Sequence, residues 1–467
     1  MRVLFTTYPS VAHLLPIVPL AWAFQSAGHE VRIASHYSIT DNITAAGLTA
    51  VALGEPQSTE ARNREDAPTP RDPELVLAYA EALGLNEEEL EHWITFFQYM
   101  LIPAADYVRP DLPEAGDLIA FAQAWKPDLV LWDPTFSSAP FAARLSGAAH
   151  GRLLFGTDCF AWSLQRLAAR REQVRAAGLP ENPLADLLRP LAERHGVEID
   201  DELLLGQWTV DPTPPGYGPP TTVTTIHVRH VPYSGAEPAQ PWLLHEPQVP
   251  RVALSLGESN RRFIPGDWDR LPKLIEAVDG LGVEVVATLN ALQLQGIEKL
   301  PDNVCAIEWV PLTQLLPTCS AIIHHGGVGT MAAARALRVP QISCDTGESL
   351  LLRQETAAPD AVDTGTYQVG REFGVAEAVE ATAPRWIMPA KSTEATPVAN
   401  YLSRTGAGVA LNHRALSVEE IGKLILQVVE LPRFRTGAAA IHESWLATPS
   451  PAEVVGTLVA LVGNRRG

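Results

Sequence analysis

Residues 321–336 read AIIHHGGVGTMAAARA, and this stretch carries more information about the fold than any other. An apolar, β-branched run ends at His324, a glycine-rich turn follows, and Met331–Ala336 has the composition of a good helix. Glycine lets a backbone adopt positive φ angles and approach a ligand closely. The stretch therefore predicts a strand, a tight turn and a helix that begins beside the turn.

This turn also has the composition of an anion site. The amides of Gly327, Gly329 and Thr330 would lie near the positive end of the helix dipole, and His325 adds a side-chain donor. No lysine follows the glycines, and the third glycine and later acid of a dinucleotide fingerprint are missing. Close packing of a helix on a strand is the competing interpretation of the glycines.

Composition limits the classes of function. The chain has 467 residues, 46% hydrophobic and 19% charged, which is enough for two or three domains with large cores. Its net charge of −19 disfavours nucleic acid and anionic membranes as partners, because Arg170-Arg171 and Arg465-Arg466 are too short to offset it. We expect a cytoplasmic protein, since no signal-peptide pattern, paired cysteine spacing or apolar run of ~20 residues is found.

The order of predicted elements repeats in the two halves of the chain. Strands are expected in the first half at Arg2–Thr7, Glu30–Ser35, Leu129–Trp132 and Leu153–Phe155, with helices at Leu14–Ser26 and within Pro73–Ala122. They are expected in the second half at Arg251–Leu256, Glu284–Leu289, Ala306–Val310 and Ala321–His324. Between them, Pro212–Pro250 is rich in proline and reads as a linker with one strand at Thr225–Val231. This order predicts two parallel-sheet α/β domains, whether related or merely of the same class.

Two more segments of the second half carry candidate ligand contacts. Ser259 lies in a loop directly after a strand, where its hydroxyl would reach a phosphate. Trp309 would stack on a planar base while the Val310 backbone hydrogen-bonds the base edge. An ordinary loop and a core tryptophan are the competing interpretations.

A histidine in the first half is placed for acid–base chemistry. His13 lies in the loop between the first strand and the first helix, and we expect it to face the cleft. Its type suits proton abstraction near neutral pH. Asp133 follows the strand LVLW at the matching end and would orient the imidazole. Alone, each is better explained as an ordinary loop or strand-end residue, and the pairing is what suggests catalysis.

Taken together, these motifs resemble the family 1 glycosyltransferases. The resemblance is closest to the bacterial branch that decorates macrolide and anthracycline antibiotics, including desosaminyl-, mycaminosyl- and forosaminyl-type transferases. It rests on HHGGVGT, the preceding WVP, His13 and Asp133, and on IVPLAWAFQSAGHEVRIAS, KPDLVLWDP, LLLGQWTVDP, LPDNV, LLPTCSAIIHHGG and PSPAEVV.

The resemblance implies the GT-B fold, an α/β architecture of two Rossmann-like parallel-sheet domains that face a central cleft. Residues 1–235 would bind the acceptor. Residues 236–453 would bind the donor and include an insertion at about 345–392. Residues 454–467 would form a helix that crosses back to the N-terminal domain.

The resemblance also implies the reaction. His13 would be the general base and Asp133 its partner, in an inverting transfer of a deoxysugar from a dTDP-sugar to a hydroxyl of a polyketide macrolide. An aminodeoxysugar such as forosamine or desosamine is one expectation, and neither metal nor other cofactor is expected. Donor contacts would be Ser259, His325, Gly327, Gly329 and Thr330 at the diphosphate, and Trp309 and Val310 at the base.

The sequence departs from the family's pattern after Gln341. The acid that contacts the donor sugar would be Asp345 or, by alignment backwards from GAGVAL, Glu394, which is slightly favoured. The long stretch between them would be a lid over the donor or a disordered excursion.

Some members of the branch need an auxiliary protein related to haem monooxygenases, and a homodimer is also open. We expect the auxiliary protein at the helical stretch Pro73–Tyr107. Within it, EHWITFFQYMLIP would line the aglycone pocket or, as is favoured, form core. The alternatives to a transferase are a sugar-nucleotide epimerase of the same fold and an inactive homologue that supports a partner enzyme.

Overall fold

The structure is a computed structural model that describes residues 1–54, 73–101, 104, 107–108, 113–235, 237–257, 270–291, 293–294, 297–345, 353–354, 387–388 and 392–466. It divides into two compact units. Unit 1 comprises Met1–Val228, Leu352–Met388 and Pro449–Gly467, and unit 2 comprises Arg229–Leu351 and Pro389–Thr448. These divisions fall a few residues before the expected ones at 235/236 and 453/454. They also place residues 353–354 and 387–388 of the expected insertion in unit 1.

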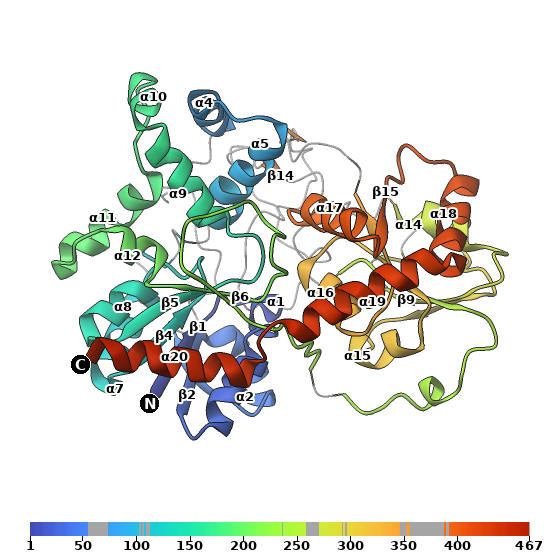
Figure 1. Ribbon diagram of the computed structural model, residues 1–467, viewed down its shortest axis with the longest axis horizontal. Coiled ribbons are helices and arrows are strands. Elements are labelled where there is room, and N and C mark those ends of the chain that lie inside the picture. Colours follow the sequence, from blue (N-terminus) through green and yellow to red (C-terminus); the bar gives the residue numbers. More distant parts are fainter. Residues whose placement is uncertain are drawn as a thin grey trace. The chain divides into compact units, whose positions relative to one another are not determined.

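Unit 1 is built on a seven-stranded parallel sheet with the order β3-β2-β1-β4-β5-β6-β7 (Figure 1). The strands are β1 (Arg2–Thr6), β2 (Glu30–His36), β3 (Thr49–Leu53), β4 (Leu129–Trp132), β5 (Ala149–Leu153), β6 (Thr209–Asp211) and β7 (Thr225–His227). β1 and β4 pair through four residues, from Val3↔Leu129 to Thr6↔Trp132. The loops after β1 and β4 therefore emerge side by side at the carboxyl edge of the sheet.

Helices surround this sheet and connect its strands. They are α1 (Val11–Leu14), α2 (Val18–Ser26), η1 (Tyr37–Ile39), α3 (Thr40–Ala45), α4 (Pro73–Leu83), α5 (Glu87–Ile94), the π-helical η4 (Thr95–Met100), α7 (Glu114–Trp125), α8 (Ala139–Ser146), α9 (Cys159–Ala169), α10 (Arg171–Ala176), α11 (Pro183–His195), α12 (Asp201–Leu205) and α20 (Pro451–Arg466). The single helix expected at Leu14–Ser26 is two helices, α1 and α2. Pro16 lies in the break between them, where a residue without an N–H cannot continue a helix.

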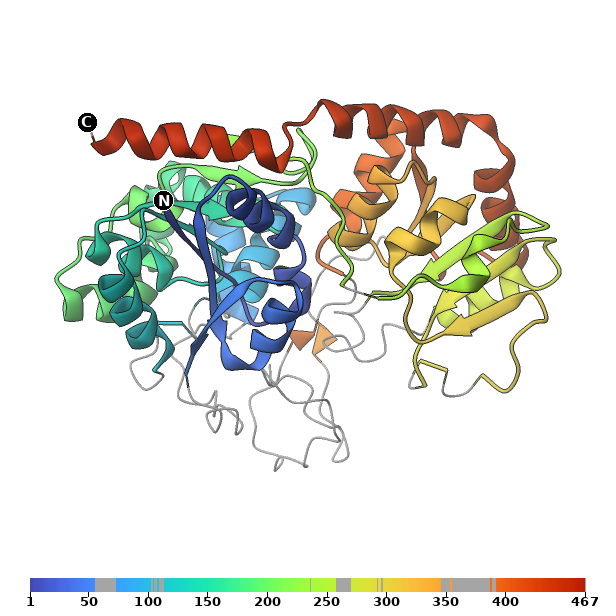
Figure 2. The same cartoon turned by 90° about the horizontal axis from the view of Figure 1, so that it is seen from below.

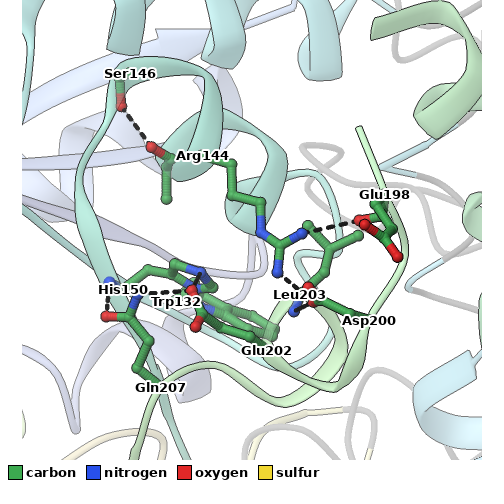
Figure 3. Close-up of polar contacts among 10 residues, drawn as sticks. Trp132, Arg144, Ser146, His150, Glu198, Asp200, Glu202, Leu203 and Gln207 are labelled. Atoms are coloured by element: carbon green, nitrogen blue, oxygen red, sulfur yellow. Dashed lines mark hydrogen bonds and ion pairs between the residues drawn. The ribbon is translucent and has the colours of Figure 1, made fainter. Parts of the chain in front are cut away.

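The prediction of a strand at Leu153–Phe155 is wrong. The strand is Ala149–Leu153, and its five residues AHGRL are all buried. The polar members have partners, as Figure 3 shows for His150. Its ring Nδ1 accepts a hydrogen bond from Trp132 Nε1 at 3.3 Å, and its backbone N–H donates to Gln207 Oε1 at 3.1 Å. A prediction from apolar residues missed this strand because buried polar side chains interrupt its pattern. The strands expected at Thr225–Val231 and Ala306–Val310 are likewise shorter or shifted.

The segment EHWITFF belongs to the core of unit 1. Trp93, Phe96 and Phe97 are fully buried, and the Trp93 indole donates to the Val76 carbonyl at 3.0 Å. Their rings pack on one another and on Tyr79 and Phe160. The favoured interpretation of these residues as core is thus confirmed. Ile102 and Pro103, at the end of the predicted segment, lie outside the described residues.

Unit 2 repeats the architecture with the six-stranded order β10-β9-β8-β11-β12-β15, again parallel throughout. Its strands are β8 (Arg251–Ser255), β9 (Glu284–Thr288), β10 (Val304–Ile307), β11 (Ala321–His324), β12 (Gln341–Cys344) and β15 (Gly408–Leu411). Numbered from its own first strand, each sheet begins with the order 3-2-1-4-5-6. This shared doubly wound topology shows that the two halves repeat one design.

The helices of unit 2 are η5 (Pro241–Leu244), α14 (Leu271–Val278), α15 (Leu312–Leu315), η6 (Leu316–Thr318), α16 (Val328–Ala336), α17 (Ala395–Thr405), α18 (Val418–Glu430) and α19 (Pro432–Ala447). The amphipathic α18 begins with a capping box, in which Ser417 and Glu420 bind each other's backbone amides. Most of the expected insertion lies outside the described residues. Two short strands within it are described, β13 (Arg353–Gln354) and β14 (Ile387–Met388), and they pair antiparallel.

The chain ends with a helix that belongs to unit 1. Helix α20 packs against α2, and its residues Val454, Val455, Leu458 and Val462 are at most 4% exposed (Figure 2). By length and composition, one stretch of the described residues, Pro432–Asn464, is apolar enough to span a membrane, although the sequence was expected to contain none. In the structure this stretch is two helices, α19 and α20, separated by the non-helical residues 448–450.

Candidate active site

The structure brings the predicted base and its acidic partner together in unit 1. His13 lies in the short helix α1, which follows β1, and Asp133 follows β4. His13 Nδ1 is 2.6 Å from Asp133 Oδ2, which is a short hydrogen bond between neighbouring strand ends. The Asp133 side chain is 3% exposed and that of His13 is 19% exposed. The carboxylate is therefore held in the protein, while part of the imidazole is open to solvent.

Further hydrogen bonds hold this carboxylate in place. Its Oδ1 accepts from the Thr135 amide at 2.9 Å and the Thr135 hydroxyl at 2.7 Å, and its Oδ2 also accepts from the Tyr8 amide at 3.3 Å. Burial alone would raise the pKa of Asp133. The nearby His13 and the hydrogen bonds from His13 and Thr135 outweigh burial and lower this pKa below its ordinary value. Asp133 is thus an ionised, fixed acceptor for the Nδ1–H of His13.

Aromatic rings fix the plane of the imidazole. The Phe155 ring centroid is 4.0 Å from that of His13, and the Tyr8 ring centroid is 5.2 Å away. Phe155 follows β5, the neighbour of β4 in the sheet. With Nδ1 bound to Asp133 and the ring packed between aromatic side chains, Nε2 is the nitrogen left to take a proton from a ligand. This is the arrangement that a general base needs.

In unit 2 the HHGGVGT segment folds as the predicted strand, turn and helix. β11 ends at His324, Gly326 has a φ of +85°, and α16 begins at Val328. The backbone amide of Gly326 donates to His324 Nδ1 at 3.2 Å, so His324 closes the turn. Gly329 is exposed, with open space where a Cβ would lie. The first amides of α16 therefore face a region that a ligand can approach.

His325 sits in a cradle of two glycines. A Cβ on Gly257, which follows β8, would lie 2.1 Å from His325 Cε1, and a Cβ on Gly327 would lie 2.3 Å from His325 Nε2. Both glycines are therefore required for the ring to occupy its place. Gly326 is constrained as well, because a Cβ there would lie 2.6 Å from the Cα of Ala395. The turn and the start of α17 thus pack directly on each other.

Both histidines of the turn are neutral in the folded protein. Burial lowers the pKa of His324 to about 4, against a small opposing effect of Gln341. Burial also lowers the pKa of His325 to about 3, helped by His324 and Arg270 and opposed by a hydrogen bond with the Ser255 backbone. We therefore expect the His325 imidazole to bind an anion as an uncharged N–H donor.

These neutral histidines predict a loss of stability in acid. In an unfolded chain an imidazole titrates near its ordinary pKa of 6.5, so below that pH the unfolded state binds more protons than the folded state. The free energy of unfolding should then fall as the pH falls from about 7 to 4. We expect the midpoint of urea unfolding to decrease between pH 7 and pH 5, and to decrease less in His324→Asn. In this variant the amide oxygen can still accept from Gly326.

The control for this prediction is His195→Asn at the end of α11, which should lose as much stability in acid as the unmodified chain. An equal decrease in His324→Asn and in the unmodified protein would show that His324 does not contribute to the acid sensitivity.

The predicted base-binding residues have contrasting environments. The Trp309 side chain is 44% exposed, and Val310 is 3% exposed. Trp309 is thus not a core tryptophan, and that competing interpretation is wrong. The exposed indole is available to stack on a base, whereas the burial of Val310 gives no support to a backbone contact at that residue.

The two candidates for the sugar-contacting acid lie close together. Asp345 follows β12, and its Oδ2 accepts from the Thr396 hydroxyl at 3.2 Å. Glu394 is the residue before α17 and two residues from Thr396. Both acids are therefore at the start of α17, which packs on the turn at Gly326. Their positions do not distinguish which acid contacts the sugar. The predicted phosphate contact Ser259 lies outside the described residues.

The fold and the site define a GT-B glycosyltransferase. The solved structure of the glycosyltransferase VinC in complex with dTDP superimposes with a TM-score of 0.72, 31% sequence identity and 100% coverage of both chains. Residues 22–257 match the N-terminal domain of the family described as erythromycin biosynthesis protein CIII-like, and residues 272–361 match its C-terminal domain. The chain belongs to this family of glycosyltransferases.

Curated relatives extend over the whole chain. An aclacinomycin-T 2-deoxy-L-fucose transferase of Streptomyces galilaeus is 37% identical and covers 100% of this chain and 97% of its own length. A 3-alpha-mycarosylerythronolide B desosaminyl transferase of Saccharopolyspora erythraea is 35% identical, with 100% and 99% coverage. The protein is accordingly an enzyme of glycosyl transfer.

Some residues of the site were missed by sequence reasoning. Phe155 and Tyr8 were not predicted to hold the imidazole, and Gly257 was not predicted to contact His325. Thr135 could have been found, because an Asp-Pro-Thr turn lets threonine bind the aspartate locally. The contact of Gly257 could not, because it joins two strands about seventy residues apart in sequence.

Proposed function

We propose that the enzyme transfers a deoxysugar from a dTDP-sugar to a hydroxyl group of a polyketide aglycone, with inversion at the anomeric carbon. The observation that carries the proposal is the 2.6 Å contact between His13 and the buried Asp133. Two observations support the dTDP donor. The chain is similar to the dTDP complex of VinC, and the start of α16 offers uncharged N–H donors to an anion.

In the proposed reaction, the acceptor hydroxyl loses its proton to His13 Nε2 as its oxygen attacks the anomeric carbon of the sugar. A bond forms between the anomeric carbon and the acceptor oxygen. The bond between the anomeric carbon and the diphosphate oxygen breaks, and its electron pair stays on the departing diphosphate. Asp133 accepts the Nδ1–H and stabilises the imidazolium that forms. A single displacement of this kind inverts the configuration of the carbon.

The departing diphosphate would be stabilised in unit 2. The amides of Gly329 and Thr330 in the first turn of α16 and the neutral imidazole of His325 are donors for its oxygens. We propose that these groups suffice without a metal ion or another cofactor. Trp309 would stack on thymine, and Asp345 or Glu394 would bind the sugar.

Relatives guide the choice of substrates. The desosaminyl relative favours a macrolide acceptor with an aminodeoxysugar such as desosamine or forosamine. The aclacinomycin-T relative supports a second candidate, an anthracycline acceptor with a neutral deoxysugar such as 2-deoxy-L-fucose. A cytoplasmic location, a homodimer and an auxiliary protein bound near α4 and α5 also belong to this proposal.

A substrate panel tests the proposal. Mycarosylerythronolide B and aclacinomycin T are each incubated with dTDP-desosamine, dTDP-forosamine and dTDP-2-deoxy-L-fucose, and products are identified by mass spectrometry. We expect one glycosylated product with release of dTDP, at a rate that EDTA does not change. Conversion of a dTDP-sugar without any acceptor would instead indicate an epimerase. Donor binding without turnover, even with an auxiliary protein present, would indicate an inactive homologue.

A further inference from the structure

The tripeptide Asp-Pro-Thr occurs at residues 133–135, after β4, and again at 211–213, at the end of β6. In both copies the aspartate Oδ1 accepts two hydrogen bonds from the threonine two residues later. The amide contacts are 2.9 and 2.8 Å, and the hydroxyl contacts are both 2.7 Å. The same short sequence thus holds both carboxylates in the same local structure.

The second carboxylate oxygen faces an imidazole Nδ1 in both copies. Asp133 Oδ2 is 2.6 Å from His13 Nδ1, and Asp211 Oδ2 is 3.8 Å from His227 Nδ1. His227 ends β7 and is the register partner of Asp211 across the two strands. Its Nδ1 is buried and makes no hydrogen bond with the described part of the chain, whereas the side chain as a whole is 35% exposed. The exposed side of the ring is therefore the side that carries Nε2.

Both pairs lie along the carboxyl edge of the same sheet. β4, β5, β6 and β7 are consecutive parallel neighbours, as Figure 1 shows for the first three. At ~4.8 Å between strands, Asp211 is displaced by roughly 10 Å from Asp133 along this edge. Phe155, which packs on His13, follows the intervening β5. The carboxyl edge is where doubly wound sheets bind their ligands.

Among the charged groups around Asp211, His227 is the one placed to form an ion pair with it. Burial raises the pKa of Asp211 to about 6, with lowering effects of the Thr213 hydrogen bonds and of His227 and a raising effect of Asp158. Asp158 itself is bound by both terminal nitrogens of the buried Arg152, each at 2.7 Å. Because Arg152 binds Asp158, His227 is the basic side chain that lies 3.8 Å from Asp211 in the described residues.

We propose that His227, oriented by Asp211, is a second acceptor-binding imidazole, whose Nε2 hydrogen-bonds an oxygen substituent of the polyketide away from the hydroxyl that receives the sugar. This inference rests on the proposed function, because it takes unit 1 as the half that binds the acceptor. An ionised Asp211 opposite Nδ1 favours the tautomer with the proton on Nδ1, which leaves Nε2 to accept from a hydroxyl group. His227 thereby sets which oxygenated face of the acceptor is presented to His13.

Steady-state kinetics with the best acceptor of the panel test this inference. We expect His227→Phe to raise the acceptor KM about tenfold, the effect of one lost hydrogen bond, with kcat within about threefold and dTDP affinity unchanged. His227→Gln should recover most of the loss, because its amide can occupy the position of Nε2. His195→Phe, the same change at a histidine of α11, is the matched control.

A pH profile distinguishes the orientation of His227 by Asp211 from the mere space that the His227 side chain fills. Asp211→Asn keeps an oxygen for both Thr213 bonds but replaces the negative charge opposite Nδ1 with an uncharged amide, so position 211 no longer favours a proton on Nδ1. We expect a higher acceptor KM whose pH dependence near 6 is flattened. The groups that face this pair are Asp158, held by Arg152, and the Thr213 hydroxyl, and neither variant removes them.

The outcomes distinguish this inference from the proposed function. An unchanged acceptor KM in His227→Phe, with His13→Ala inactive, overturns the role of His227 and leaves the proposed function standing. Turnover that persists in His13→Ala overturns the proposed function itself. If His227→Phe lowers the melting temperature and raises the donor and acceptor KM equally, His227 is structural and the inference is wrong.

Discussion

His13→Ala is expected to lower kcat by about 10³-fold while leaving dTDP affinity within twofold of the unmodified enzyme. In the proposed mechanism the imidazole accepts the acceptor proton as the new C–O bond forms, so its removal affects the chemical step. The proposed dTDP contacts belong to unit 2, whereas His13 belongs to unit 1. The measurement combines initial rates with the productive donor and acceptor pair and calorimetric titration of dTDP.

Asp133→Asn gives an independent second variant of the same pair. Its amide keeps an acceptor for Thr135 but presents NH₂ to His13 Nδ1, which leaves Nε2 protonated and unable to act as a base. We expect kcat to fall about 10²-fold or more. His195→Ala should retain full activity. Turnover of His13→Ala within a few-fold of the unmodified enzyme would show that the catalytic assignment is wrong.

The second large effect is expected in donor binding. His325→Ala should weaken dTDP affinity about tenfold or more, because a hydrogen bond to a charged group is lost from a buried site. Since the pKa of His325 is lowered to about 3, this ratio should stay constant from pH 5.5 to 8. Isothermal titration calorimetry at several pH values measures both quantities.

Two further variants make this test specific to the ring position. Gly327→Ala leaves the imidazole in the chain but displaces it, because the new Cβ would lie 2.3 Å from Nε2. It should weaken dTDP binding to a similar degree. His442→Ala in α19 removes a histidine of the same unit and should bind dTDP normally. Unchanged affinity in His325→Ala would overturn the assignment of the diphosphate site.

Local sequence was enough to predict the elements that carry the site. The strands ending at His324 and Trp132 have the predicted bounds, because apolar β-branched runs are closed there by glycine or proline. From the matching strand ends, His13 and Asp133 were expected to be close, and the structure brings them within hydrogen-bonding distance. Their catalytic roles stay predictions.

Other parts of the site depend on contacts that a sequence pattern does not contain. β5 was displaced in the prediction because its buried His150 and Arg152 are stabilised by partners 57 residues away, Gln207 and Thr209. The cradle of His325 needs Gly257 from another strand. The pair Asp211–His227 was missed although its Asp-Pro-Thr motif repeats residues 133–135, because the histidine reaches it only through strand pairing. The pairing of His13 with Asp133 could be predicted from matching strand ends, whereas these other tertiary contacts could not.

The packing of α20 on α2 has a consequence for biosynthesis. Residues 18–26 are synthesised early, whereas the helix that covers them, with Leu458 fully buried, begins more than 400 residues later in the sequence. The first unit therefore cannot complete its surface until α20 has been synthesised, and until then an apolar face of α2 is uncovered. During that interval the nascent protein is exposed to chaperones and to aggregation.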